Sequence, residues 1–127
     1  MATINRFEDL EAWREARRLA QVVYLLSGRG QFKRDFGLRD QIRRAAVSTM
    51  SNLAEGFERS SQRELVRYLV IARASAAEVE SHAFLALDLD YVTAAQFAEL
   101  RERTKAVKAL IGGFVRYLTR LDPNPRT

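Results

Sequence analysis

Five polar side chains between residues 41 and 55 recur at spacings that would place them on one face of a helix. The intervals between Gln41, Arg44, Ser48, Asn52 and Glu55 are 3, 4, 4 and 3 residues, so a helix would align them in a stripe. Such a stripe can be a buried hydrogen-bond network, a subunit contact or a binding site. We expect a packed, mutually hydrogen-bonded stripe near a helix–helix interface. Catalysis is the least favoured use, because no Ser/His/Asp arrangement accompanies it.

Residues that usually support metal or covalent chemistry are scarce. The single histidine, His82, follows Glu78 by one helical turn, and two ligands fall short of a metal site. The chain has no cysteine, which excludes disulfides, thiolate zinc sites and a cysteine nucleophile. The stretch GRGQFKRDFG (28–37) lacks the GK[ST] ending and the preceding strand of a phosphate-binding loop. We therefore predict no enzymatic activity, metal or cofactor.

Basic residues offer a more concrete function. Guanidinium and ammonium groups about 5–6 Å apart on a helix can engage phosphates without reading bases. The candidates for nucleic-acid binding are Arg101, Lys105, Lys108, Arg116, Arg120, Arg43, Arg63 and Arg67. Further arginines in the same region as the last three are Arg39, Arg59 and Arg73. The alternative is that these residues form an ordinary solvated helix face. Four aromatic residues are expected in the core rather than as base-stacking platforms: Trp13, Tyr24, Tyr68 and Phe114.

Charge is segregated along the chain. The net charge of +5 divides into 0 for residues 1–28, +5 for 29–73, −5 for 74–100 and +5 for 101–127. Such segregation favours an anionic partner for the basic segments, or contact between a basic segment of one subunit and an acidic segment of another.

The elements that must position these residues are predicted to be four helices. Apolar residues recur at steps of three and four over about 8–27, 38–58, 62–89 and 94–121, with a polar tail at 122–127. Connections of about ten, three and four residues favour an all-α, antiparallel up-down-up-down four-helix bundle. A length of 127 residues fits one domain over 1–127. No apolar run approaches the roughly 20 residues of a membrane span, and no leader is evident, so we expect an unprocessed, soluble, cytoplasmic protein.

Several residues mark the ends and contacts of these helices. Ser60 or Ser61 is the expected N-cap of the third helix, with Glu64 at capping-box spacing, and Thr93 that of the fourth. Gly56 indicates either close helix approach or fraying at the end of the second helix. Within the loop at 28–37, two aromatic residues are expected to cover the end of the core, Phe32 and Phe36.

The last two helices carry unusual apolar patterns. The third is apolar over more than one face, which predicts burial against two layers or in a subunit interface. The fourth has a heptad-like seam from Phe97 to Leu121. Gly112 and Gly113 lie within this helix, where each costs about 1 kcal/mol relative to alanine. Close contact with another helix is the expected reason for them.

Three stretches resemble a bacterial four-helix-bundle family that includes proteins encoded in 23S ribosomal RNA intervening sequences: FEDLEAWREARRLAQVVY, FGLRDQIRRAAVSTMSNLAEGFERSS and RYLVIARASAAEVESHAFLALDLDYV. The accessory protein of diversity-generating retroelements looks like a relative. The resemblance covers roughly residues 7–118, and GLRDQIRRAAVSTMSNLAEG is its most specific part. One departure is Ala74, where such proteins often have glycine before the serine, here Ser75.

The resemblance implies a ring-like homo-oligomer, a pentamer, with a positively charged surface. For the retroelement relatives it also implies contacts with nucleic acid and a reverse transcriptase. We therefore expect a non-enzymatic scaffold whose basic surfaces bind RNA, DNA or a nucleoprotein through phosphates. The alternative is a protein–protein interaction ring in which the charges serve subunit or partner docking.

Overall fold

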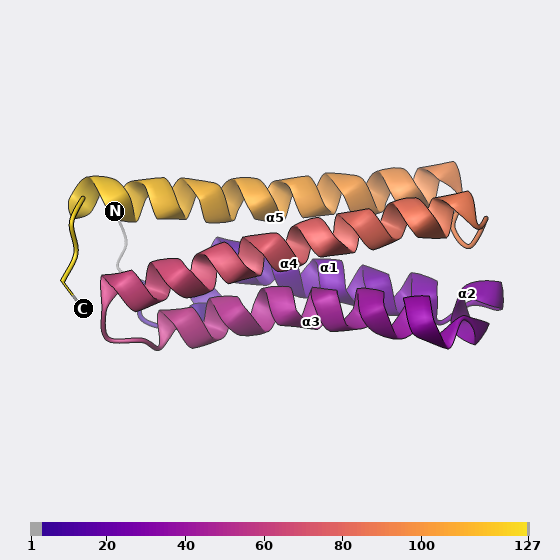
Figure 1. Cartoon of the computed structure of the whole chain (residues 1–127), viewed down its shortest axis with the longest axis horizontal. Coiled ribbons are helices and arrows are strands. Elements are labelled where there is room, and N and C mark those ends of the chain that lie inside the picture. Colours follow the sequence, from indigo (N-terminus) through magenta and orange to yellow (C-terminus); the bar gives the residue numbers. More distant parts are fainter. Residues whose placement is uncertain (1–3, 127) are drawn as a thin grey trace.

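The computed structural model describes residues 4–126, and all of its regular elements over that range are helices. Four long helices lie side by side in Figure 1, and the chain travels the length of the molecule along each of them. They are α1 (Glu11–Ser27), α3 (Phe36–Phe57), α4 (Gln62–Asp88) and α5 (Ala94–Leu121). Helix α3 packs on α4, α4 packs on α5, and α1 packs on both α3 and α5. The all-α prediction is confirmed. The predicted domain and tail limits at 1 and 127 lie outside the described residues.

The first long helix begins later than residue 8. Residues Phe7–Asp9 form a short 3-10 helix, η1. Leu10 then adopts an extended conformation with φ −76° and ψ 122°, which separates η1 from α1. The Leu10 side chain is buried, and the rings of Phe7 and Trp13 meet edge to face at 5.1 Å between centroids. This extended residue therefore turns the start of the chain onto α1.

The predicted ten-residue loop contains a short helix, α2 (Gly30–Arg34), and α3 begins at Phe36 instead of Leu38. The earlier start follows from Asp35, whose carboxylate caps α3 by accepting the Leu38 N–H at 3.0 Å. Of the two loop aromatics, Phe32 is buried and stacks on Tyr91 at 5.3 Å between centroids. Phe36 is 64% exposed, so the prediction that it covers the core was wrong.

The other two connections follow the predicted capping. Ser61 accepts the Glu64 N–H at 3.1 Å, although Glu64 turns its own carboxylate to Arg67. Thr93 and Gln96 form a full capping box, with bonds of 2.9 and 3.1 Å. Helices α4 and α5 therefore begin at the predicted residues.

Gly56 marks a close approach between α3 and α4. A Cβ atom built on this glycine would lie 2.6 Å from the Cβ of Tyr68. Of the two readings that the sequence left open, the structure therefore favours close packing over fraying, since any side chain here would displace Tyr68.

The core lies between the four long helices. Its largest fully buried side chains are Phe32, Leu19, Ile42, Leu53, Leu69, Leu100 and Ile111. The apolar spacing over 38–58 predicts one inner face for α3, and the structure confirms it by burying Leu38, Ile42, Ala45, Thr49, Leu53 and Gly56. The α5 seam is buried at Leu100, Thr104, Val107, Ile111 and Leu118, but Leu121, in the last turn, is 63% exposed.

Within residues 4–126 of the single chain, the close helix contact predicted for the glycine pair in α5 is not found. A Cβ built on Gly112 would meet one atom within 4 Å, the Arg116 Nη1 at 3.3 Å, and one on Gly113 would meet the Arg116 Nη2 at 3.8 Å. No other helix backbone approaches either position this closely. The space beside the two glycines is therefore used by a side chain of the same helix.

The extra apolar surface of α4 stays uncovered in the single chain. Val70 is 56% exposed, and Ile71, Phe84 and Leu85 are exposed as well.

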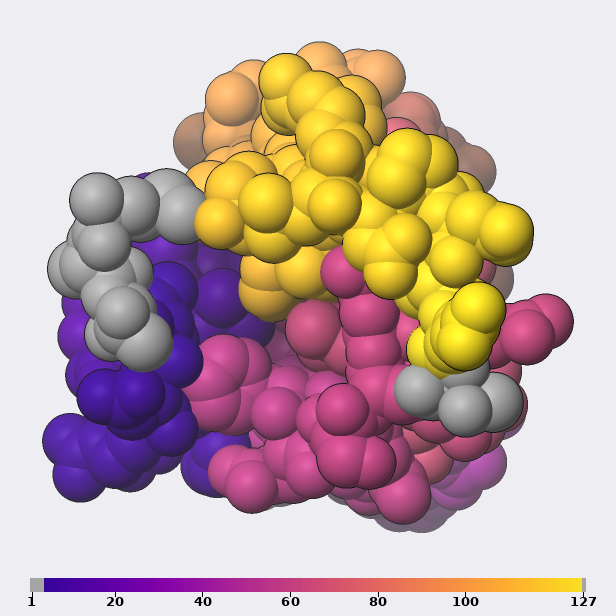
Figure 2. Space-filling view, turned by 90° about the vertical axis from the view of Figure 1, so that its left-hand side faces the viewer, coloured from indigo at the N-terminus to yellow at the C-terminus, as the bar shows by residue number. Residues whose placement is uncertain are grey.

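At the end of the molecule seen in Figure 2, the yellow C-terminal segment lies against the magenta residues of the α3–α4 connection. Gln62 contributes to this contact by donating to the Asp122 carbonyl at 3.0 Å. Over residues 4–126, no helix has the length and apolarity that crossing a membrane requires.

Candidate nucleic-acid interface

The middle of the polar stripe on α3 forms a hydrogen-bonded group with α4. The hydroxyl oxygens of Ser48 and Ser75 lie 2.9 Å apart. Asn52 donates through Nδ2 to both the carbonyl and the hydroxyl of Ser48, at 2.8 and 3.0 Å. All three side chains are buried or half-buried. These side chains thus form their hydrogen bonds inside the α3–α4 contact. They hold the two helices in register and do not form a ligand site.

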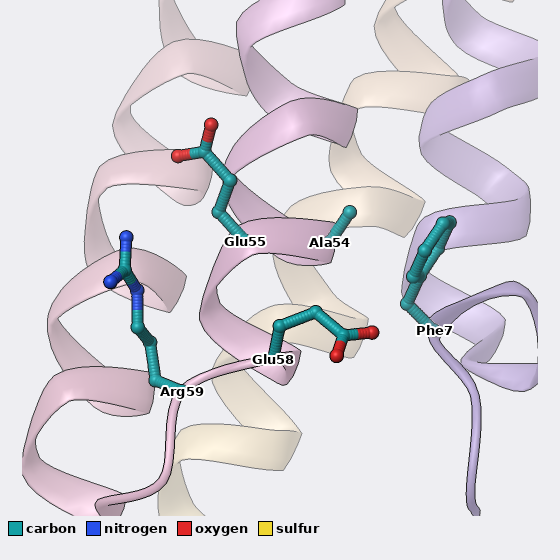
Figure 3. A pocket seen from close by; sticks show the side chains of 5 residues that line it. All are labelled: Phe7, Ala54, Glu55, Glu58 and Arg59. Carbon is teal, nitrogen blue, oxygen red and sulfur yellow. The ribbon is translucent and has the colours of Figure 1, made fainter.

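The ends of the stripe reach solvent instead. Gln41, Arg44 and Glu55 are exposed. Glu55 lies at the rim of a hollow of about 280 Å³ between η1 and the end of α3, where Glu58 points toward Phe7 (Figure 3). The structure therefore divides the stripe into a packed centre and exposed ends. The hollow combines an aromatic ring with two carboxylates and the guanidinium of Arg59, and nothing in it converges as a nucleophile–base pair would.

Two of the predicted phosphate contacts on α5 are already occupied. Lys108 donates to Glu80 of α4 at 2.8 Å, and the Arg101 Nε lies 3.3 Å from the other oxygen of the same carboxylate. The ammonium of Lys108 and, to a smaller extent, the guanidinium of Arg101 hold the pKa of Glu80 below its usual value against the effect of burial. Arg101 also lies 5.5 Å from the ring centroid of Phe84. Glu80 therefore neutralises part of the basic row, the set of predicted α5 cations formed by Arg101, Lys105, Lys108, Arg116 and Arg120.

The rest of the row remains uncommitted. Lys105, Arg116 and Arg120 are exposed, and no carboxylate within residues 4–126 forms an ion pair with any of them. Arg120 makes one long contact, from Nε to the Arg116 carbonyl at 3.5 Å. These three residues are the part of α5 that is free to meet an anion.

The two predicted arginines at the start of α4 line one open hollow. Arg63 is exposed there without an acidic partner in the described chain, whereas Arg67 pairs with Glu64 at 2.9 Å. The guanidinium of Arg67 also lies 5.1 Å from the centroid of the Tyr68 ring. Glu64 and Arg67 stabilise each other's charged forms, so the pKa of Glu64 is lowered and that of Arg67 raised. Arg63 is thus the freer of the two.

Arg43 stabilises the contact between α3 and α1 and is not part of the basic row. Its Nε donates to the buried Ser27 hydroxyl at 2.7 Å, and its guanidinium covers the Tyr24 ring at 4.5 Å. This contact also corrects the expected core position of Tyr24, which is 46% exposed beneath the arginine. Trp13, Tyr68 and Phe114 are half-buried.

The sequence offered Arg73 only as a further arginine near the main candidates, and the structure places it beside Arg116. It lines a hollow of about 190 Å³ between α4 and α5 together with Arg116 and Gly112. Helical spacing assigns Arg73 to a face of α4, but it does not reveal which turn of α5 lies opposite. No signal within α4 alone could have joined Arg73 to Arg116.

Metal-binding geometry is not found in the described part of the chain. No group of three or more His, Asp or Glu side chains there could hold an ion. His82 and Glu78 face each other with 3.4 Å between Nε2 and Oε2. This is a surface contact between neighbouring turns of α4.

The fold and this surface define a class: an all-helical protein of four long helices with a partly neutralised basic face on α4 and α5. The family described as 23S rRNA-intervening sequence protein matches residues 8–113, and the chain belongs to that family. The predicted resemblance is therefore confirmed.

A solved structure supports the fold. The chain is similar to a protein of unknown function from the S23 ribosomal protein family of Bacteroides thetaiotaomicron, whose crystal structure was determined at 1.70 Å. The two share 21% sequence identity with a TM-score of 0.75, and the alignment covers 82% of this chain and 97% of that chain. No curated protein sequence matches this chain.

Proposed function

We propose that this chain is a non-enzymatic, cytoplasmic scaffold that binds nucleic acid, or a nucleoprotein, through phosphate contacts. Its building block is an antiparallel up-down-up-down bundle, and five copies assemble into a ring. The ring and the number five come from the resemblance described above. The observation that carries the binding proposal is the group of exposed cations without acidic partners on α4 and α5, formed by Arg63, Arg73, Lys105, Arg116 and Arg120.

Phosphates are the ligand class that suits this group. Arg116 and Arg120 lie one turn of α5 apart, about 5–6 Å, and Lys105 lies about three turns before Arg116. Such a row neutralises a polyanion without requiring a shaped pocket. A row of this kind reads charge and backbone spacing, so structured RNA and duplex DNA are both suitable partners, alone or bound to an enzyme such as a reverse transcriptase. Base-specific readout is not expected from it.

Self-association is supported by the uncovered apolar face of α4. Ile71 and Leu85 are exposed, and the small residues Ala74 and Ala77 lie exposed between them. An apolar face interrupted by small residues allows another helix to approach closely, and monomers rarely leave such faces open. A second copy of this chain is the proposed occupant.

A protein–protein interaction ring without nucleic acid is the second candidate. The observation that favours it is the use of Glu80 to hold Arg101 and Lys108, because charges paired within a chain serve packing first. The acidic segment 74–100 and the two basic segments would then join neighbouring copies.

Charge reversal separates the two candidates. We expect a variant with Lys105→Glu, Arg116→Glu and Arg120→Glu to lose binding to duplex and structured RNA while its mass in solution stays that of the wild-type oligomer. A control variant reverses three exposed arginines that lie outside α4 and α5, Arg17, Arg18 and Arg29. It should bind RNA more tightly than the first variant. Dissociation of the first variant into monomers would favour the protein-only ring.

A further inference from the structure

The absence of side chains at Gly112 and Gly113 in α5 leaves space for the guanidinium of Arg116. Arg116 lies back along its own helix, with Nη1 3.3 Å from the position of a Cβ on Gly112 and Nη2 3.8 Å from that of a Cβ on Gly113. Glycine is a poor residue for a helix interior, and no neighbouring backbone requires these two. The absent side chains instead leave a notch in which the planar guanidinium lies against the helix.

A second guanidinium lines the same place. The hollow of about 190 Å³ beside the notch is lined by Arg116 and Gly112 of α5 and by Arg73 of α4, with apolar walls from Val70, Ile111 and Val115. No carboxylate of residues 4–126 pairs with Arg73 or Arg116. Elsewhere along the α4–α5 contact, the cations Arg101 and Lys108 face each other across Glu80. In the hollow the two cations come instead from different helices, and neither of them pairs with a carboxylate among residues 4–126.

We infer that Arg73 and Arg116 form a two-arginine clamp for one phosphate group of a nucleic-acid backbone, with Gly112 providing the space that holds Arg116 in position. The inference rests on the proposed function, which it narrows to one site. Guanidinium forks match the paired oxygens of a phosphate, and apolar walls strengthen such bonds by lowering the local dielectric. Lys105 and Arg120 continue the positive charge along α5, which suits a polyanion better than an isolated anion.

Neutral substitutions test the clamp with structured RNA as the probe. We expect Arg73→Gln and Arg116→Gln each to weaken binding about tenfold, because each removes charge-assisted hydrogen bonds. Lys105→Gln is the matched control, since it removes one charge from the same helix without lining the hollow, and it should cost only about twofold to threefold through the general salt-dependent attraction. Equal losses for all three variants would overturn the clamp.

The two glycines provide a test that leaves every charge in place. Gly112→Ala puts a methyl group 3.3 Å from the seated guanidinium, whereas Gly113→Ala makes an ordinary contact at 3.8 Å. Both substitutions favour helix and should leave the melting temperature unchanged or higher. Only Gly112→Ala is expected to weaken RNA binding, by about threefold or more, since a charge-assisted bond depends on geometry. Identical RNA affinities for the two alanine variants would contradict the role of Gly112 in holding Arg116 in position.

A titration with inorganic phosphate, followed by the NMR signals of the Arg73 and Arg116 side-chain N–H groups, separates the possible failures. Localised shifts of both signals, with RNA affinity lowered in the arginine variants, support the clamp. If phosphate shifts both signals but Arg73→Gln leaves RNA affinity unchanged, the ligand is a free anion and the backbone assignment fails. If RNA binds and neither signal responds to RNA or phosphate, the clamp fails while the proposed function stands. If RNA does not bind at low salt, the proposed function itself fails.

Discussion

Glu80 is predicted to limit nucleic-acid binding, because it occupies two cations of the basic row. Lys108 lies 2.8 Å and Arg101 3.3 Å from its carboxylate oxygens. A phosphate held by Lys108 would sit roughly 6 Å from that carboxylate, the length of two charge-assisted hydrogen bonds placed end to end. Substituting Glu80→Gln should therefore strengthen binding.

The size of the gain follows from Coulomb's law. Two unit charges about 6 Å apart repel by about 0.7 kcal/mol in a water-like dielectric, which is about threefold in Kd. If the freed cations take up phosphates on a duplex, the dependence of log K on log salt should also steepen by about 0.9 for each new contact. The stability loss should be at least about 1 kcal/mol, the upper end for exposed pairs, because the Glu80 side chain is only 15% exposed.

Fluorescence anisotropy with labelled duplex RNA over a salt series measures both quantities. The matched control is Glu99→Gln, which removes the same charge and frees Arg103 from a pair of 3.3 Å roughly half a turn around α5 from the row. We expect the control to change Kd less than Glu80→Gln does. An unchanged or weaker affinity for a folded Glu80→Gln variant, or equal gains for both variants, would refute the account of Glu80.

Two further predictions concern the fold. Gly56→Ala should lower the free energy of unfolding by about 1–3 kcal/mol, because overpacking against the Tyr68 Cβ at 2.6 Å outweighs the gain in helix propensity; urea denaturation measures this, and a stability gain equal to that of Gly113→Ala would contradict the close approach. Tyr91→Phe should lower the melting temperature, since it removes the 2.9 Å bond to Asp35 that ties the start of α3 to the α4–α5 connection. The pKa of Asp35 is lowered by the Leu38 N–H and then by Tyr91, so this stability is present above the ordinary carboxyl pKa of about 3.9 and is lost as the pH falls below it. Melting curves at neutral pH and at acid pH test the sign, and a difference between Tyr91→Phe and wild type that grows as the pH falls would contradict it.

Features within single helices could be predicted from the sequence. The inner face of α3 follows from the spacing of its apolar residues, and the caps at Ser61 and Thr93 follow from local hydrogen-bond chemistry. Such features depend on residues within about a turn of each other, so periodicity and residue type are sufficient. The start of α3 was harder, because Asp35 lies between two helical segments and its capping role competes with a loop.

For contacts between helices, the sequence predicted the kind of contact but not the partner residues. The stripe on α3 indicated a hydrogen-bonded interface, but its partner Ser75 and the exposure of Gln41 and Glu55 depend on how α4 is rotated and shifted against α3. The same offset between α4 and α5 brings Glu80 between Arg101 and Lys108. The periodicity of a helix shows which residues share a face, but it does not show which turn of the neighbouring helix lies opposite them.

Phosphate binding by the α4–α5 face is tested most directly by the affinity of the wild-type protein for a structured RNA across a salt series. We predict measurable binding at low salt that weakens steeply as salt rises, with log K falling linearly against log salt by about 0.7–0.9 for each phosphate neutralised. Absence of binding at low salt, or binding that does not depend on salt, would contradict it.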